Sequence, residues 1–530
     1  MTSSINAAML QLVRRAEGNE VGDLVDTFVS AGTLIELLQS ADHQIVYGRR
    51  GTGKTHLLQF LTEKVSERGD VAVYVDLRTV GSNGGIYADP NIPLTERGTR
   101  LLVDVLSHLY NTLASLLITA SYGDGFDYTD ALNKLDLFEA SITDVRITGD
   151  EEQSVRLESV DSDAGQVSLA AGSNGIKAQF GGSSGAQSTS EVNASVRGPR
   201  RYNVHFGAVS SAIRMMVEAL PGRLWLILDE WSDVPLDLQP LLADLLRRCV
   251  MPVRDVSVKV GAIEQRSNFS APDGVGGYIG FELGADIFAD LELDEFMVFG
   301  NDEERAKAFF AELLFKHVSR FLNDDGRASI ADADEFVRKA FTQRNAFAEF
   351  VRAVEGVPRD AINIAILAAK VAADDPISVP HVRQAARQWY LRDKEKSVQA
   401  NPQTIELLHW VIDEVIGTRR ARAFLLEQGH SAKHDLVASL YDSRVLHVIK
   451  RGVSANDRPG VRFDVFTLDF GCYVQLISTT AAPEGLFEIE DEESGVEFVE
   501  VPKDDYRSIR RAVLDLEAFD RRKEVPPRRR

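Results

Sequence analysis

One stretch of the chain decides its fold: His43-Gln-Ile-Val-Tyr-Gly-Arg-Arg-Gly-Thr-Gly-Lys-Thr-His56. From Gly48 to Thr55 it matches G-x-x-x-x-G-K-[ST], the pattern of a phosphate-binding loop. A short apolar strand pattern leads into the loop and a helical pattern leaves it, which is the context that this motif requires. The sequence therefore predicts a site for a nucleoside triphosphate.

The residue types in this loop have separate roles. Glycines accept positive φ, so the backbone N–H groups and the start of the next helix can surround a polyphosphate. We expect Lys54 to reach the β- and γ-phosphates and the Thr55 hydroxyl to ligate Mg²⁺. The expected binding residues for ATP and its Mg²⁺ are Gly48, Arg49, Arg50, Gly51, Thr52, Gly53, Lys54, Thr55 and His56.

Composition sets the outer limits. With 530 residues, 44% of them hydrophobic and 26% charged, the chain has the composition of a globular protein with several domains. A net charge of −21 opposes general wrapping in nucleic acid, so any DNA contact must be local. We find no apolar run of a membrane-span length and no signal-peptide pattern, and expect a cytoplasmic protein without membrane contact. Cys249 and Cys472 are expected to be buried thiols, and no cluster has zinc-ligand spacing.

A second motif reads Arg223-Leu-Trp-Leu-Ile-Leu-Asp229-Glu230. In phosphate-loop ATPases, an apolar strand that ends in two acidic residues places one carboxylate near Mg²⁺ and the other beside the attacking water. Asp229 is the expected metal residue, and Glu230 is the expected general base, so Lys54 and Glu230 are the leading catalytic candidates. Small GTPases lack a neighbouring catalytic glutamate, which argues against that class.

Strand and helix patterns alternate through the first 300 residues. They predict a doubly wound parallel sheet with the nucleotide at the carboxyl ends of the strands. The expected strands are 45–47, 71–78, 223–229, 256–263 and 290–299. The first forty residues have helical periodicity. Residues 121–204 are rich in Gly and Ser with short alternating runs, which indicates an insertion of β-hairpins or a largely disordered segment.

The helical block after residue 301 contains Glu355-Gly-Val-Pro-Arg359, a turn that presents an arginine at the start of an apolar helix. Here the chain resembles the AAA+ ATPases, most closely the origin-recognition initiator branch and its bacterial relatives, over roughly residues 20–395. The resemblance implies an ATPase core (1–300), a helical lid (301–397) and a "sensor 2" contact from Arg359 to the γ-phosphate.

The chain departs from that family after the strand at 256–263. The usual "sensor 1" Asn, Ser or Thr is replaced by Glu264-Gln-Arg266, in which Gln265 is a possible equivalent. Arg266 is either a subunit-bridging finger, a contact within its own subunit or a surface arginine. Residues 398–482 have the order of a winged helix, which initiator ATPases commonly carry.

The sequence does not decide between DNA and protein as the binding partner. The expected recognition helix, 433–444, has balanced charge, while basic residues occur on the expected wing at Lys450, Arg451, Arg458 and Arg462, so both DNA and protein remain candidate partners. Residues 483–530 are acidic and then basic, as in a solvated tail whose end could contact nucleic acid. The leading interpretation is an ATP-dependent switch or remodeller that assembles with itself or a partner. The alternatives are a signalling or defence ATPase and a mobile-element accessory factor.

Overall fold

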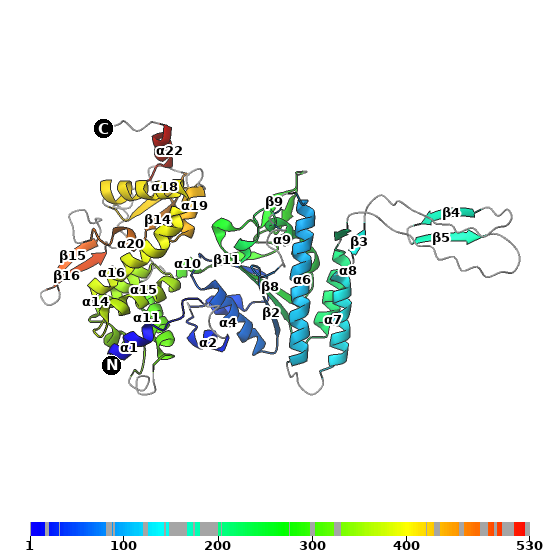
Figure 1. Cartoon of the computed structure of the whole chain (residues 1–530), viewed down its shortest axis with the longest axis horizontal. Helices are drawn as coiled ribbons and strands as arrows, with labels where there is room; N and C mark the ends of the chain where they lie inside the picture. The colour runs from blue at the N-terminus through cyan, green and yellow to red at the C-terminus, as the bar shows by residue number, and fades with distance from the viewer. Residues whose placement is uncertain are drawn as a thin grey trace, which may run out of the picture.

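The computed structural model describes most of the chain. The described residues are 2–15, 21–30, 32–80, 87, 89, 91–119, 126–142, 145–147, 167–172, 175–180, 200–202, 204–274, 276–296, 303–322, 330–419, 421–428, 435–454, 460–477, 486–491, 495–500 and 513–524. Figure 1 shows a central sheet flanked by helices, with the lid and the C-terminal elements on one side and a projecting hairpin on the other.

The core is a five-stranded sheet in which every neighbouring pair is parallel. Its order is β11 (Phe288–Glu292), β1 (Gln44–Tyr47), β8 (Val256–Ala262), β7 (Leu224–Asp229) and β2 (Val71–Asp76). Apolar strands buried on both faces are typical of such a sheet. The predicted α/β fold with a doubly wound parallel sheet is confirmed, with one shifted boundary. The fifth strand ends at Glu292, where α10 (Leu293–Phe296) begins, rather than continuing to 299.

Helices cover both faces of the sheet. The helix after the phosphate loop, α4 (Lys54–Ser66), packs on one face together with α3 (Leu34–Leu38). The other face is covered by α6 (Leu94–Thr119), α8 (Phe206–Glu218) and α9 (Gln239–Cys249). Because parallel strands end at one edge of the sheet, this packing brings the phosphate loop and Asp229 to the same side.

Part of the predicted insertion is helical. Helix α7 (Tyr128–Ile142) lies between α6 and α8, and Phe138 and Leu135 on its inner face are 0% and 1% exposed. Apolar residues at 131, 135, 138 and 142 have helical spacing, so a set of β-hairpins starting at 121 was the wrong prediction for this part.

The rest of the described insertion consists of two antiparallel pairs. β3 (Val145–Ile147) pairs with β6 (Arg200–Tyr202), and β4 (Val167–Gly172) pairs with β5 (Gly175–Phe180). The β4–β5 hairpin projects from the body in Figure 1. One of the short alternating runs of the predicted insertion, residues 154–160, lies outside the described residues.

The helical lid follows the core as predicted. Its helices are α11 (Glu303–Ser319), α13 (Ala333–Ala340), α14 (Arg344–Val354), α15 (Pro358–Ala372) and α16 (Val379–Trp389). The first helix of the chain, α1 (Thr2–Met9), shares their hydrophobic core, although the sequence placed it with the ATPase core. Asn6 secures it by donating a hydrogen bond of 2.7 Å to the carbonyl of Ala373. The chain therefore starts in the lid and crosses to the sheet.

We call residues 402–477 the C-terminal unit. It contains α18 (Pro402–Ile412), β12 (Ala423–Glu427), α19 (Asp435–Asp442), β13 (Leu446–Ser454) and β14 (Arg462–Leu468). The strands form an antiparallel sheet in the order β12-β14-β13. These helices and strands follow one another in the predicted order, and their interpretation as a winged helix stays a prediction.

The region predicted as a solvated tail contains ordered elements. β15 (Leu486–Asp491) and β16 (Gly495–Glu500) form an antiparallel pair, and α22 (Leu516–Glu524) follows. Phe519 of α22 is 5% exposed and its ring centroid lies 5.5 Å from that of Trp410 in the C-terminal unit. The solvated-tail prediction is therefore wrong for the segment around Leu514 and Phe519, because the Phe519 ring packs on Trp410 of α18 and the Leu514 N–H donates a hydrogen bond of 3.0 Å to the Leu425 carbonyl in β12.

Two further expectations concern α6 and the thiols. Helix α6 is long and apolar enough to cross a membrane, but such a helix is weak evidence of a span because buried helices of protein cores share its composition. Its apolar stripe packs against α7, α9 and β2. Both cysteines are free thiols, Cys249 being buried and Cys472 half-buried.

Candidate nucleotide-binding site

The phosphate loop joins β1 to α4 in the geometry that its glycines allow. Gly51 and Gly53 have φ values of 91° and 95°, in the left-handed region that favours glycine. Lys54 folds back over the loop, and its Nζ donates hydrogen bonds to the carbonyls of Gly48 at 2.7 Å and Arg49 at 3.1 Å. Burial lowers the pKa of Lys54, while Asp229, Glu230 and Asp294 act in the opposite direction.

Asp229 is fixed at the carboxyl end of β7. Its side chain is 0% exposed, and the hydroxyl of Tyr74 donates a hydrogen bond of 2.7 Å to its Oδ2. Its Oδ1 accepts a hydrogen bond of 2.8 Å from the backbone N–H of Glu230. A Cβ at Gly261 on the adjacent strand would lie 2.7 Å from that Oδ1, so only glycine leaves the carboxylate its space. Tyr74 was not predicted, because nothing in a strand pattern shows that a tyrosine faces another strand's aspartate.

Glu230 has an unusual backbone. Its φ and ψ are 56° and 39°, a left-handed conformation that costs a residue other than glycine about 1 kcal/mol or more. The conformation turns the Glu230 carboxylate toward Arg78, whose Nη1 lies 3.6 Å from Oε1. Burial and the neighbouring Asp229 raise the pKa of Glu230, while Lys54 and Arg78 oppose that shift. A carboxylate with a raised pKa accepts a proton more readily near neutral pH.

The residues present fit Mg²⁺ bound together with a nucleotide. Thr55 lies half-buried in the first turn of α4, and Asp229 ends the strand beside it in the same region. Among the described residues, no group of three metal-binding side chains occurs. Mg²⁺ commonly takes only one or two protein oxygens and completes its shell with phosphates and waters. A two-residue set matches that chemistry.

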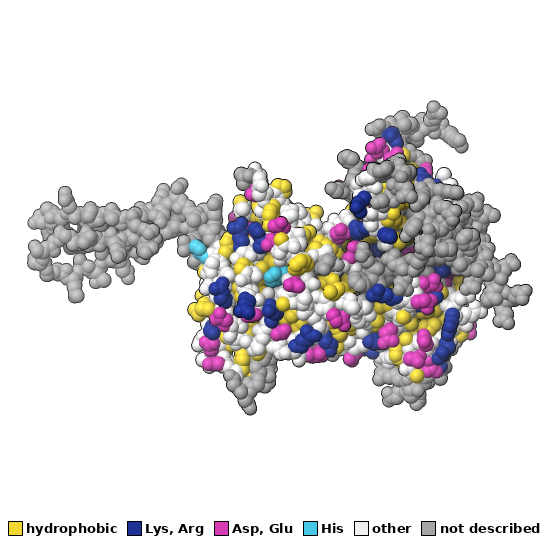
Figure 2. All heavy atoms as spheres, turned by 180° about the vertical axis from the view of Figure 1, so that it is seen from behind, with side chains coloured by type: hydrophobic (Ala, Val, Ile, Leu, Met, Phe, Trp, Pro, Cys, Tyr) yellow, Lys and Arg dark blue, Asp and Glu magenta, His cyan; other side chains and the backbone are white. Residues whose placement is uncertain are grey.

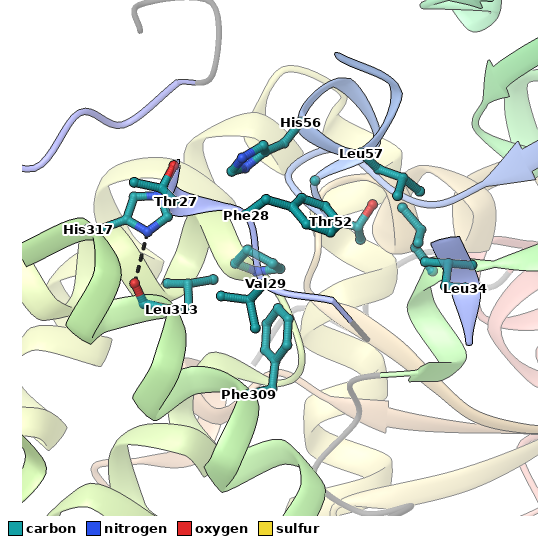
Figure 3. Close-up of a pocket in the computed structure, with 13 residues that line it drawn as sticks. Thr27, Phe28, Val29, Leu34, Thr52, His56, Leu57, Phe309, Leu313 and His317 are labelled. Carbon is teal, nitrogen blue, oxygen red and sulfur yellow. Dashed lines mark hydrogen bonds between the residues drawn. The ribbon is translucent and has the colours of Figure 1, made fainter. Parts of the chain in front are cut away.

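A pocket opens directly beside the loop. Its walls come from the segment before α3, from the loop and α4, and from the lid, as Figure 3 shows. The lining residues are Thr27, Phe28, Val29, Leu34, Thr52, Gly53, His56, Leu57, Leu293, Phe309, Leu313, His317 and Pro358. Mostly apolar walls with a few polar groups are suited to a nucleobase. The sequence motif predicted His56 at the site but missed the lid and N-terminal walls, since they come from distant parts of the chain.

The two histidines of the pocket are neutral. His56 Nε2 lies 2.5 Å from the carbonyl oxygen of Leu24, so this nitrogen carries the proton and donates it. His317 Nδ1 donates to the carbonyl of Leu313 at 2.8 Å, and burial lowers the pKa of His317 to about 4. The pocket therefore presents neutral rings and alkyl groups.

The structure brings Arg359 to the phosphate loop. It lies in the first turn of α15, and its backbone N–H donates a hydrogen bond of 3.1 Å to the carbonyl of Gly51. Its charge acts to lower the pKa of Lys54, so the two cations share one electrostatic environment. Gln265 and Arg266 lie in the turn after β8, where Gln265 is exposed and Arg266 forms an ion pair with Asp442 of the C-terminal unit.

Arg49 is directed away from the loop and into the C-terminal unit. Its guanidinium is 1% exposed and its Nε pairs with Asp294 at 2.6 Å. Nη1 donates to the Leu446 carbonyl at 3.0 Å and lies 3.0 Å from His447 Nδ1. Because arginine only donates, Nδ1 of His447 must be unprotonated. Burial lowers the pKa of His447 to about 4.

Tyr441 completes this contact. The Arg49 guanidinium lies 4.8 Å from the centre of the Tyr441 ring, and the Tyr441 hydroxyl donates to Asp294 at 3.1 Å. Arg50, the next loop residue, is exposed and pairs with Asp233 at 3.4 Å. The C-terminal unit therefore packs directly on the phosphate loop, which the sequence did not predict.

One residue of the expected wing contacts the core that carries the parallel sheet. Arg451 forms ion pairs with Glu264 at 2.7 Å and Glu292 at 3.1 Å. Its side chain is 25% exposed. Arg451 therefore holds the C-terminal unit on the core in this structure. Arg462 donates a hydrogen bond of 3.4 Å to the carbonyl of Gly452 within the same unit, and Arg458 is outside the described residues.

One comparison with known proteins, the match to a family model, agrees with the motif. Residues 12–86 match the family model described as ORC-CDC6-like. No curated protein matches the chain. Among similar solved structures is the ORC1 protein of Aeropyrum pernix in complex with DNA, with 14% sequence identity, a TM-score of 0.32, and coverage of 84% of this chain and 91% of that one. Residues 12–86, which contain the whole phosphate loop, are therefore similar to the ORC-CDC6-like family.

Proposed function

We propose that this chain binds ATP with Mg²⁺ and hydrolyses it as a switch of the AAA+ initiator type. The observation that carries this proposal is the convergence of two distant segments on the phosphate loop that holds Lys54, one of them through the hydrogen bond from the Arg359 N–H to the Gly51 carbonyl. Asp229 and Glu230 at the end of β7 and Arg359 at the start of α15 all act on the pKa of this lysine. Such a cluster of opposed charges beside a phosphate loop is what a nucleotide-hydrolysing site requires.

Each group has a role in the proposed reaction. The loop N–H groups and Lys54 hold the β- and γ-phosphates, and the pocket in Figure 3 holds the base. Thr55 and Asp229 hold Mg²⁺, which when bound neutralises phosphate charge. Glu230 accepts a proton from the attacking water. Arg359 senses the γ-phosphate from the lid. The exposed position of Gln265 gives the sensor 1 assignment no support.

Two substitutions test the chemistry. Lys54→Ala should abolish ATP binding, because it removes the only loop side chain expected to reach two phosphates. Glu230→Gln should keep binding and lower turnover by about a hundredfold or more, since the loss of a general base costs that much. Lys64→Ala is the matched control, because Lys64 lies on the same helix and pairs only with Glu67 at 2.7 Å among the ion pairs described.

The measurements are titration calorimetry with ATP and phosphate release at saturating ATP. Equal turnover in the unaltered chain and Glu230→Gln would remove Glu230 as the base. Unchanged ATP affinity in Lys54→Ala would overturn the proposal itself.

Two kinds of partner are proposed, DNA and a second copy of this chain. DNA is a candidate because the resemblance to initiator ATPases implies it, and a local site on the C-terminal unit or the basic end of the chain is compatible with the net charge of −21. Figure 2 shows basic and acidic side chains interspersed over the described part of one face. We also include self-association in this proposal, which sedimentation with and without ATP would test.

A signalling or defence ATPase is the second candidate function. The observation that favours it is the packing of the C-terminal unit on the phosphate loop through Tyr441 and Arg49. Fluorescence anisotropy of labelled duplex DNA at two salt concentrations separates the candidates. DNA binding that appears with ATP and weakens with salt supports the initiator type. ATP-dependent capture of a protein without DNA binding supports the signalling type.

A further inference from the structure

Asp442 brings a carboxylate of the C-terminal unit to the phosphate side of the ATPase core. It is the last residue of α19, and its Oδ2 pairs with Nε of Arg266. The Asp442 side chain is 6% exposed, whereas that of Arg266 is 42% exposed. The cation that the sequence offered as a finger or γ-phosphate contact is therefore already neutralised from within the chain.

The second oxygen of Asp442 has no partner in the described part of the chain. Its Oδ1 is buried and makes no hydrogen bond there. A buried, half-satisfied carboxylate costs free energy unless nearby cations compensate for the loss of water. Burial raises the pKa of Asp442, whereas Arg266, Arg50 and Lys54 lower it through their charges. The positive charges that compensate Asp442 therefore come from the phosphate loop and from Arg266.

We propose that Asp442 acts as an internal substitute for the γ-phosphate, so that the docked C-terminal unit opposes ATP and tolerates ADP. The proposal rests on the proposed ATP-binding function and adds its regulation. Arg266 pairs directly with Asp442, and the charges of Arg50 and Lys54 act on the pKa of its carboxyl. Arg50 and Lys54 belong to the set expected at the phosphates of ATP. The γ-phosphate of ATP would bring negative charge to cations that the Asp442 carboxylate already neutralises.

Other contacts hold the C-terminal unit in place, so Asp442 is not needed for docking alone. Arg444 donates to Asp360 in the lid at 3.0 Å, and Lys394 of the lid pairs with Asp469 of the unit. Arg49 and Arg451 add the contacts to the core described above. These ion pairs and hydrogen bonds remain when the charge of Asp442 is removed. The effect of Asp442 on nucleotide choice is therefore separable from the attachment of the unit.

The test is titration of the full chain with ADP and with a non-hydrolysable ATP analogue. Asp442→Asn has the same size and lacks the charge. It should tighten the affinity for the analogue by about tenfold and leave that for ADP unchanged, within the usual range of coupling between sites. Asp435→Asn is the matched control, because Asp435 is exposed at the start of the same helix. It should change neither affinity.

Two further measurements make the outcome decisive. Asp442→Glu keeps the charge and should keep the analogue-to-ADP ratio of the unaltered chain. In limited proteolysis, the analogue should expose the C-terminal unit of the unaltered chain but not that of Asp442→Asn. An unchanged ratio in Asp442→Asn, or a Glu variant that behaves like Asn, would overturn this inference alone. Failure of the unaltered chain to bind either nucleotide would overturn the proposed function and this inference with it.

Discussion

The backbone N–H of Arg359 donates a hydrogen bond to the carbonyl oxygen of Gly51, with 3.1 Å between the two atoms. This bond joins the first turn of a lid helix to the phosphate loop. A Cβ at Gly51 would lie 2.8 Å from that of Arg359, so the two backbones meet with no room for a larger residue. Lid and loop are therefore coupled at the place where the phosphates of a nucleotide are expected.

The first prediction concerns the Arg359 side chain. Its guanidinium can form two parallel bonds to phosphate oxygens and cannot lose its charge. Arg359→Ala should weaken ATP binding relative to ADP by about tenfold to a hundredfold, the value of a charge-assisted contact worth roughly 1.5–3 kcal/mol. Arg359→Lys should rescue only part of that loss. Titration of both nucleotides against each variant measures the effect.

A neighbouring arginine supplies the control. Arg344 begins the lid helix α14 and is exposed. Arg344→Ala should leave the ratio of ATP to ADP affinity unchanged. If Arg359→Ala also leaves it unchanged, Arg359 holds the lid on the loop through its backbone only, and the sensor role is wrong.

The sequence predicted what short-range patterns encode. The phosphate loop, the Asp229–Glu230 pair and the parallel sheet follow from residue spacing, because loop geometry and strand periodicity are local properties. The prediction went wrong at 128–142, where Gly- and Ser-rich neighbours obscured the helical spacing of Leu135 and Phe138.

Short-range sequence patterns could not predict contacts between segments that are distant in the chain. Tyr74 and Asp229 are 155 residues apart, and Arg49 and His447 are 398 residues apart. The sequence showed Tyr74 only as a strand residue, Arg49 only as a loop residue and His447 only as a scattered histidine. The docking of the C-terminal unit on the loop depends on the packing of three separate parts of the chain. It could not be read from any one of them.

The second prediction concerns Arg49 and its neighbour Arg50. Arg49→Ala should lower the free energy of unfolding by about 3–5 kcal/mol, because it leaves the buried carboxylate of Asp294 without its main partner. Arg50→Ala should change it by no more than about 0.5 kcal/mol, since Arg50 is 49% exposed. Urea unfolding without nucleotide, with hydrogen exchange at 435–454 as a local readout, compares the two variants. Similar losses would mean that the Arg49 contacts do not hold the C-terminal unit.

The third prediction concerns the insertion. Replacing residues 150–197 by a short Gly-Ser linker should leave the melting temperature and ATP affinity unchanged, because β3 and β6 pair across the base of the deletion. The β4–β5 hairpin projects from the body, so assembly or partner binding should change instead. Removing α7 is the contrasting variant, and it should destabilise the chain because Phe138 is 0% exposed. Unfolding of the linker variant would show that the hairpin supports the core.

The last prediction concerns Glu292, which the core shares with Arg451 of the C-terminal unit. Burial raises the pKa of Glu292 to about 7, Arg451 acts against that shift, and Glu264 and Asp294 add to it. In the unfolded chain the carboxyl returns to its ordinary pKa of about 4.3. The folded chain therefore holds this proton more tightly, and its stability falls as the pH rises from about 4.3 to 7.

Glu292→Gln removes this titration. The variant should gain stability over the unaltered chain as the pH rises, from less than about 1 kcal/mol at pH 5 to about 3 kcal/mol at pH 8, where the unaltered carboxylate is charged. Glu335→Gln is the control of opposite sign. The pKa of Glu335 is lowered by the backbone N–H of Ala331 and by Lys339, so this variant should be less stable at pH 7, with the difference shrinking in acid. Thermal unfolding from pH 4 to pH 8 measures both differences. A constant difference for Glu292→Gln would show that Arg451 keeps this carboxylate charged throughout.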